Sequence, residues 1–214
     1  MNLLHNWLCQ SHRWETISKG RVEWVLDGLP LSGDVLEIGP GFGVITDLIR
    51  PAVLRLTCVE IDTGLARRLR HRLAGTNVQV LCESATALSL HDSSFDSVVC
   101  FTMLHHVPSE DMQDRLLREV SRVLRPGGVF AGADSLYSSR FHLLHLFDTM
   151  VVVNPETFPE RLKSAGLTSA HVEKRGHAFR FRARKPLTHE VTYQVEPSLP
   201  REISNNKGRF TLDP

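Results

Sequence analysis

An acid followed by three glycines at alternate positions constrains this chain more than any other stretch. The apolar run from Val35 to Ile38 has the composition of a buried strand and contains Glu37. Gly39, Gly41 and Gly43 follow it. Glycine suits a backbone that turns sharply or approaches a ligand closely, because a Cβ would occupy the ligand's space. The stretch therefore predicts a strand, a tight turn and a helix, with a ligand at the carboxyl end of the strand.

Two common phosphate-binding turns do not fit this stretch. The dinucleotide fingerprint G-x-G-x-x-G requires a glycine at the position of Val44. A P-loop requires a Lys followed by Ser or Thr, and no such pair follows Gly43. An ordinary strand–turn–helix corner needs fewer glycines than this turn has. The pattern that remains is E-x-G-x-G-x-G.

A second acid stands at the end of the next apolar run. Glu60 lies a little under 20 residues beyond Gly43, near the spacing at which an acid meets a ribose in nucleotide sites. A carboxylate can accept hydrogen bonds from both ribose hydroxyls at once. We therefore expect Glu60 and the glycine turn to contact one nucleoside-like ligand.

Composition and charge indicate a globular chain. Hydrophobic residues make up 42% and charged residues 23% of the 214 residues, as in globular proteins. The net charge of +1 gives no overall attraction to nucleic acid or to an anionic membrane. No apolar run approaches the roughly 20 residues of a membrane span, and no signal peptide is evident. The four cysteines form no C-x-x-C pair, so we expect reduced thiols and a cytoplasmic protein.

Strand-like and helix-like segments alternate beyond the glycine turn. Asp62 or Thr63 can cap one helix and Ser109 the next, and a further helix is expected over residues 135–150. The later strands are expected over residues 54–61, 77–82, 98–101, 129–133, 169–175 and 177–185. This alternation predicts a sheet with helices between its strands.

The motifs in this order resemble the class I S-adenosylmethionine-dependent methyltransferases, over about residues 35 to 134. The glycine turn resembles the family's first motif, and L-L-R-E-V-S-R-V-L-R-P-G-G resembles the segment before its fifth strand. The resemblance implies a three-layer doubly wound α/β sandwich, whose seven-stranded sheet is mostly parallel with the last strand antiparallel. It implies S-adenosyl-L-methionine as cofactor. The cofactor-binding residues that it implies are Glu37, Gly39, Gly41, Gly43, Glu60, Ile61, Ser84, Ala85 and Phe101.

The chain departs from the family at the residue that would contact the adenine of the cofactor. There the family has an Asp that accepts a hydrogen bond from the adenine amino group, whereas this chain has Ser84, preceded by Glu83. A serine hydroxyl can accept this bond but carries no charge. Either residue could serve the adenine, and we expect a weaker cofactor affinity than an Asp would give.

The substrate side gives less direct information. The segment T-M-L-H-H resembles the family's L-H-H segment, so His105 or His106 could orient a substrate or act as a base; no catalytic residue is assigned. His142 and His145 lie one helical turn apart, but no second ligand pair has a recognisable spacing, so no metal is expected. The apolar character of residues 135–156 indicates an apolar substrate or a buried lid.

Several acceptors and functions are consistent with these motifs. The stretches V-L-E-I-G-P-G-F-G and V-E-I-D are similar to ribosomal RNA adenine dimethyltransferases, but the N-L-P-Y-type segment of that family is missing, which disfavours nucleic acid. Protein arginine methylation needs paired acids that are also missing. A small-molecule or lipid-like acceptor fits best. The alternative is a catalytically silent cofactor-binding module that serves a partner protein, and an oxidoreductase is disfavoured by Val44.

The chain is expected to form one methyltransferase domain over residues 1–185. Residues 1–30 are expected to form N-terminal cap helices and residues 135–156 an insertion on the substrate side. Residues 186–214 contain several prolines and no periodicity, which predicts a loosely docked or disordered tail. The sequence leaves the oligomeric state open.

Overall fold

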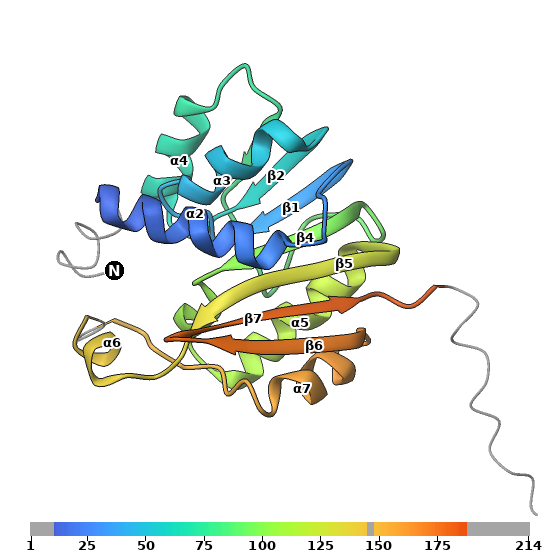
Figure 1. The fold of residues 1–214 in the computed structure, drawn as a ribbon. Helices are drawn as coiled ribbons and strands as arrows, with labels where there is room; N and C mark the ends of the chain where they lie inside the picture. The colour runs from blue at the N-terminus through green and yellow to red at the C-terminus, as the bar shows by residue number, and fades with distance from the viewer. Residues whose placement is uncertain (1–10, 145–147, 188–214) are drawn as a thin grey trace, which may run out of the picture.

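The computed structural model describes residues 11–144 and 148–187, and Figure 1 shows a sheet with helices on both faces. The seven strands run in the order β3-β2-β1-β4-β5-β7-β6. β1 to β5 are parallel, and β7 is antiparallel to both of its neighbours. The strands are β1 (Asp34–Ile38), β2 (Arg55–Val59), β3 (Val78–Leu81), β4 (Phe95–Phe101), β5 (Leu124–Ser135), β6 (Thr168–Arg175) and β7 (Ala178–Arg184). The predicted three-layer α/β fold with an antiparallel last strand is confirmed.

The helices begin where the sequence predicts their caps. The side chain of Asp62 accepts hydrogen bonds from the N–H groups of Gly64 and Leu65, and Ser109 caps the next helix. The helices are α2 (His12–Leu26), α3 (Val44–Ile49), α4 (Thr63–Arg72), α5 (Glu110–Val123), α6 (Ser139–Leu144) and α7 (Phe158–Ser164), with 3₁₀ turns η1 (Arg50–Ala52) and η2 (Leu104–His106). The helices expected within residues 1–10 and the tail over 188–214 lie outside the described residues.

Two predictions about chain breaks are wrong. The segment 125–128 was expected to precede the fifth strand, but β5 already begins at Leu124. The reason is tertiary, because the Gly127 N–H donates to the Lys185 carbonyl and the Lys185 N–H donates to the Gly128 carbonyl. The single helix expected over 135–150 is also wrong, since α6 covers only Ser139–Leu144 and residues 148–150 are not helical.

Each face of the sheet has its own apolar layer. Neighbouring strand residues point to opposite faces, so Val35 of β1 packs with α2, α3 and α4, whereas Leu36 packs with α5 and α7. Phe130 in β5 likewise packs on the α5 side, where the ring of Phe181 lies 4.9 Å from it. Helices thus cover both faces of the sheet. A site can form from the loops at the carboxyl ends of the parallel strands.

The cationic face of β7 holds α2 against the sheet. Helix α2 has no basic residue in its last turn to bind its terminal carbonyl groups. Arg182 from β7 donates to the carbonyl oxygens of Val25 and Asp27 at 2.8 and 2.9 Å, and Arg180 donates to that of Trp24. Arginines at a helix C-terminus also complement its dipole. The alternating arginines of this strand therefore fix the N-terminal helix.

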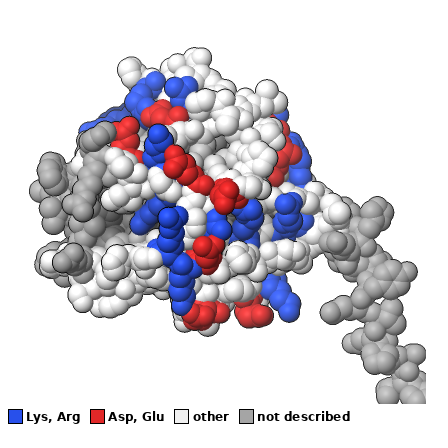
Figure 2. Space-filling view, in the orientation of Figure 1, with Lys and Arg blue, Asp and Glu red and all other residues white. Residues whose placement is uncertain are grey.

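Charges on the surface are mixed. Figure 2 shows basic and acidic side chains interspersed over one face of the molecule. This mixture gives that face no extended field of one sign of the kind that attracts nucleic acid. Within residues 11–144 and 148–187, no helix is long and apolar enough to cross a membrane.

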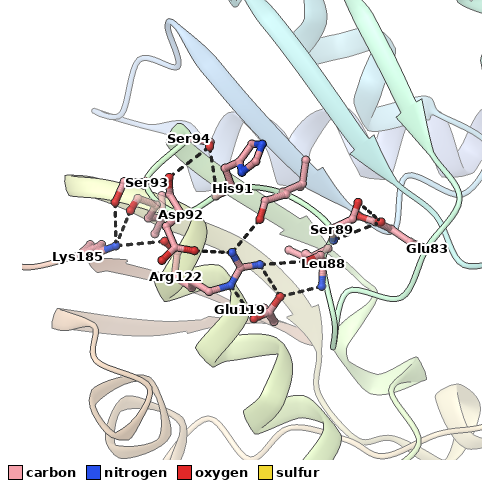
Figure 3. A network of polar contacts seen from close by, with 12 residues as sticks. Glu83, Leu88, Ser89, His91, Asp92, Ser93, Ser94, Glu119, Arg122 and Lys185 are labelled. Atoms are coloured by element: carbon pink, nitrogen blue, oxygen red, sulfur yellow. Dashed lines mark hydrogen bonds and ion pairs between the residues drawn. The ribbon is translucent and has the colours of Figure 1, made fainter.

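Arg122 anchors the segment that follows β3 to helix α5 (Figure 3). Its guanidinium pairs with Glu119 at 2.8 Å and donates to the carbonyl oxygens of Leu88 and Leu90 at 3.0 and 2.7 Å. Glu119 in turn accepts from the Leu88 N–H at 2.7 Å, and the hydrogen bond from Arg122 lowers the pKa of Glu119. Lys185 donates to the Arg122 carbonyl oxygen at 3.2 Å. This network ties the segment between β3 and β4, which contains no helix or strand, to α5.

We predict that Arg122→Lys weakens this loop. A lysine keeps the charge but cannot bind a carboxylate and two carbonyl groups in one plane. The free energy of unfolding in urea should fall by roughly 1–3 kcal/mol. Arg118→Lys, on the exposed face of the same helix, is the matched control and should change it by less than about 0.5 kcal/mol. Equal stability of the two variants would contradict the anchoring role.

Candidate active site

A cavity of about 1360 Å³ runs along the carboxyl ends of the parallel strands. Its lining includes residues directly after four strands: Gly39–Phe42 after β1, Glu60–Asp62 after β2, Glu83–Thr86 beyond β3 and Thr102–Met103 after β4. This edge is where open α/β sheets bind ligands. The glycine turn and Glu60, which the sequence predicts to contact one ligand, therefore line one cavity.

The three glycines of the turn have left-handed backbones, but they serve different contacts. A Cβ on Gly39 would overlap Met103, and one on Gly43 would overlap Leu69 and Arg72 of α4. A Cβ on Gly41 would meet no atom within 4 Å, and Gly41 lines the cavity. The first and third glycines therefore allow close packing, whereas Gly41 keeps the cavity open. Gly43 itself does not line the cavity.

Glu60 closes the turn from the neighbouring strand. Its carboxylate accepts hydrogen bonds from the Gly41 N–H at 3.0 Å and the Asp62 N–H at 2.9 Å, one on each oxygen. Glu60 is buried and lines the cavity. A carboxylate has about four acceptor positions, so two remain for hydroxyl groups of a ligand. The predicted ribose contact fits this geometry and stays a prediction.

Glu37 lies beneath the turn and is not part of the cavity lining. Its carboxylate accepts hydrogen bonds from the Thr46 hydroxyl at 2.7 Å and the Cys58 thiol at 3.4 Å, which ties β1 to α3 and β2. Burial raises the pKa of Glu37 to about 7, against these hydrogen bonds, which lower it. The structure gives Glu37 a supporting position, and its predicted contact with the cofactor stays a prediction.

The remaining predicted cofactor-binding residues, with the two adenine candidates Ser84 and Glu83, also reach the cavity. Ile61, Ser84, Ala85 and Phe101 all line it, and the side chain of Ile61 is 71% exposed at this site. The Ser84 hydroxyl is 2.8 Å from the Thr86 hydroxyl, and Glu83 lines the same region. The structure therefore brings both adenine candidates to the cavity without deciding between them.

The sequence predicts N-terminal cap helices, but it does not single out the residues of α2 that line the cavity. Trp14, Ser18 and Arg21 line the cavity, with the guanidinium of Arg21 5.6 Å from the Trp14 ring. Arg21 donates to the hydroxyls of Thr102 at 3.3 Å and Ser135 at 3.4 Å. Burial lowers the pKa of Arg21, partly offset by the charge of Asp134. Nothing in the local pattern distinguished Arg21 from the other basic residues of the chain, because its position depends on how α2 docks.

A buried histidine–aspartate pair lies near the ends of β4 and β5. Nδ1 of His105 is 2.6 Å from a carboxylate oxygen of Asp134, and both side chains are almost fully buried. Burial alone would raise the pKa of Asp134, but the charge and hydrogen bond of His105, with two backbone N–H groups, bring it below its usual value. His105 and His106 both line the cavity. Sequence reasoning noted the histidines but not Asp134, which lies on another strand.

The backbone between these groups is strained. Thr102 follows β4 and lines the cavity with a φ of +51°, a region that β-branched residues rarely occupy. Such strain is often found at functional sites. Among residues 11–144 and 148–187, no three or more His, Cys, Asp or Glu side chains are grouped so that they could hold a metal ion. His145, one of the two histidines weighed as metal ligands, lies outside these residues.

We predict that Glu37→Gln removes a pH dependence of stability. Glu37 titrates near its ordinary pKa of about 4.3 when unfolded and at about 7 when folded, so the folded protein binds the extra proton between these values. Stability should therefore fall as pH rises through this window, by up to about 3 kcal/mol in wild type. Urea unfolding from pH 4.5 to 8 should show a flatter profile for Glu37→Gln, whereas exposed Glu23→Gln should keep the wild-type slope. Equal slopes in both variants would contradict the assignment.

Known proteins match this chain in both sequence and structure. Residues 36–132 match a family model described as a methyltransferase domain. A ubiquinone biosynthesis O-methyltransferase of Pseudomonas putida KT2440 is 32% identical over 136 residues, which are 59% of this chain and 56% of that protein. A Pseudomonas fluorescens Pf0-1 protein of the same name is 29% identical over 133 residues, with the same coverage. The chain thus spans just over half the length of these relatives.

Solved structures extend the likeness beyond the matched residues. A protein from Pyrococcus horikoshii OT3 superposes with a TM-score of 0.69 and 19% identity, over 83% of this chain and 93% of that chain. DhpI in complex with SAH superposes with a TM-score of 0.66 and 20% identity, over 81% and 86%. Residues 36–132 therefore belong to the methyltransferase-domain family, and the chain that contains them has the class I S-adenosylmethionine-dependent methyltransferase fold.

Proposed function

We propose that this chain transfers a methyl group from S-adenosylmethionine to a small-molecule or lipid-like acceptor. The observation that carries the proposal is a single cavity with two kinds of lining. Gly41 and Glu60 line one part of it, and mainly apolar side chains line another part. Its volume of about 1360 Å³ exceeds the roughly 300–1,000 Å³ of pockets that hold one drug-sized ligand. The cavity therefore has room for a cofactor and an acceptor together.

The residues present fit the groups of this cofactor. Glu60 would accept from the ribose hydroxyls, and Gly41 leaves space for the backbone to approach the methionine part. Arg21 is a half-buried cation of the lining and would bind the cofactor's carboxylate, because a guanidinium binds carboxylates through paired hydrogen bonds. Ser84 or Glu83 would accept from the adenine amino group. The ribose hydroxyls, the carboxylate and the adenine amino group of the cofactor thus each have a candidate partner.

The acceptor half of the cavity is mainly apolar. Met112, Leu136 and Phe141 line it, together with His105 and His106. Such a lining favours an uncharged aromatic or aliphatic molecule. The relatives' printed name, which includes ubiquinone biosynthesis and O-methyl transfer, supports an oxygen acceptor of this kind. The mixed surface charge gives no support to a nucleic-acid acceptor.

The chain's main task in this reaction is alignment. The cofactor, when bound, supplies a methyl group on a positively charged sulfur, which is already highly reactive. Holding two reactants in line can supply an effective molarity of about 10⁵ M or more. The strained Thr102 and the packed Met103 would fix the wall between the two halves.

We predict that the protein binds S-adenosylhomocysteine, and that Gly41→Ala lowers this affinity by about tenfold or more because the methyl group enters the ligand's space. Gly43→Ala is the matched control, since both glycines have left-handed backbones that cost an alanine about 1 kcal/mol. Gly43→Ala should lose more stability than Gly41→Ala, because its Cβ overlaps α4. Calorimetric titration and urea unfolding measure the two effects.

Three outcomes separate the candidate functions. No heat with S-adenosylhomocysteine would contradict the proposal, and heat with NAD in its place would favour an oxidoreductase. Binding of S-adenosylhomocysteine without methyl transfer to any acceptor would favour the cofactor-binding module that serves a partner protein. The serine at position 84 is the observation behind that alternative, since it removes a charged adenine contact.

A further inference from the structure

We propose that the acceptor carries an anionic group, a carboxylate or a phosphate, which binds beside Arg175 in a second cavity. This inference rests on the proposed methyl transfer. The apolar lining of the large cavity describes the reacting part of the acceptor, and the inference adds a charged group outside that part. It is carried by a smaller cavity of about 340 Å³ between α2 and the turn that joins β6 to β7.

The smaller cavity adjoins the large one. Arg21 from α2 and His177 from the turn between β6 and β7 line both cavities. The backbone of this turn is fixed to the end of β5, because the Leu136 N–H donates to the His177 carbonyl oxygen at 2.8 Å and Ala178 pairs with Ser135. The two cavities therefore lie on either side of Arg21 and His177, and an acceptor of sufficient length would reach from one to the other.

The lining of the smaller cavity is both cationic and apolar. Arg21 and Arg175 line it together with Trp24 and with Ile17, whose side chain is 41% exposed. No Asp or Glu among the described residues belongs to this lining. The charge of Asp134 acts on Arg21, but Asp134 is buried and lines neither cavity. Such a lining favours a ligand that joins an apolar body to a negative charge.

Arg175 differs from the neighbouring basic residues of the two last strands. Lys174 pairs with a glutamate from the segment before α7, and Arg180 pairs with a glutamate in β6. Within residues 11–144 and 148–187, Arg175 has no carboxylate partner, and its guanidinium lies 5.9 Å from the centre of the Trp24 ring. The ring attracts the cation and leaves its N–H groups available. A guanidinium placed in this way can bind a carboxylate or a phosphate through paired hydrogen bonds.

Gly20 keeps the smaller cavity open on the side of α2. It lies inside this helix and lines the cavity, and a Cβ on it would meet no atom within 4 Å. Glycine lowers the stability of a helix relative to other residues, and no close neighbour requires it here. A larger side chain at this position would therefore enter the cavity without displacing protein atoms.

The test compares three probes that share one alkyl chain: octanoate, octyl phosphate and octanol. Each is titrated calorimetrically into the full chain saturated with S-adenosylhomocysteine, at about 0.15 M salt, where attraction to distant surface charges is largely screened. At least one of the two anions should bind about tenfold or more tightly than octanol. Arg175→Gln should weaken the binding of that anion by about tenfold or more and leave the affinity for octanol within about twofold.

Two further variants separate this site from general effects of charge. Lys174→Gln removes the same charge at the adjacent position, whose side chain points to the other face of the sheet, and should leave every affinity within about twofold. Gly20→Leu should weaken anion binding by about tenfold or more without lowering the free energy of unfolding, because leucine is the better helix former. The affinity for S-adenosylhomocysteine should stay within about twofold in all variants, because none of these residues is a predicted cofactor contact.

Defined results would overturn the inference. Equal affinities for octanol and both anions contradict it, as does the absence of binding of all three probes to the S-adenosylhomocysteine complex. An equal loss in Arg175→Gln and Lys174→Gln indicates general attraction of anions and contradicts the site. A preference for octanoate supports a carboxylate in the acceptor, and a preference for octyl phosphate supports a phosphate. A protein that does not bind S-adenosylhomocysteine at all would instead contradict the proposed function, so the two failures are distinguishable.

Discussion

The left-handed turn between β1 and α3 is the constraint on which the rest of the site depends. It is held from one side by Glu60, which accepts the Gly41 N–H, and from the other by α4, which packs against Gly43. Met103 fills the space over Gly39. Three different strand ends therefore meet at one short stretch of backbone. Because Gly41 alone of these glycines faces open space, the turn both joins the sheet and leaves a cavity above it.

Helix α2 converts this edge of the sheet into an enclosed site. Its C-terminal carbonyl groups are bound by Arg180 and Arg182 of β7, so the last strand fixes the first described helix. That docking brings Trp14 and Arg21 over the cavity. Residues far apart in the sequence thus line the same cavity as the glycine turn. The His105–Asp134 pair lies near the ends of β4 and β5, next to Ser135, whose hydroxyl accepts a hydrogen bond from Arg21.

The features that the sequence predicted correctly are those encoded locally. Strand and helix periodicity, the caps Asp62 and Ser109, and the glycine turn all act within a few residues, so the sheet and one half of the cavity could be predicted. Arg21 and Asp134 could not, because each becomes part of the site only through packing against a distant element. The extra length of β5 was missed for the same reason, since its pairing with Lys185 is tertiary. Glu37 matched a motif, yet its side chain points beneath the turn to Thr46.

A crystal structure with bound S-adenosylhomocysteine tests the central claim most directly. The account predicts the ligand in the cavity of about 1360 Å³, with its ribose hydroxyls within hydrogen-bond distance of Glu60 and its methionine part beside Gly41. Its carboxylate should lie on Arg21, and its sulfur should face the half that contains His105. A ligand bound elsewhere, or one whose ribose does not contact Glu60, would contradict the account.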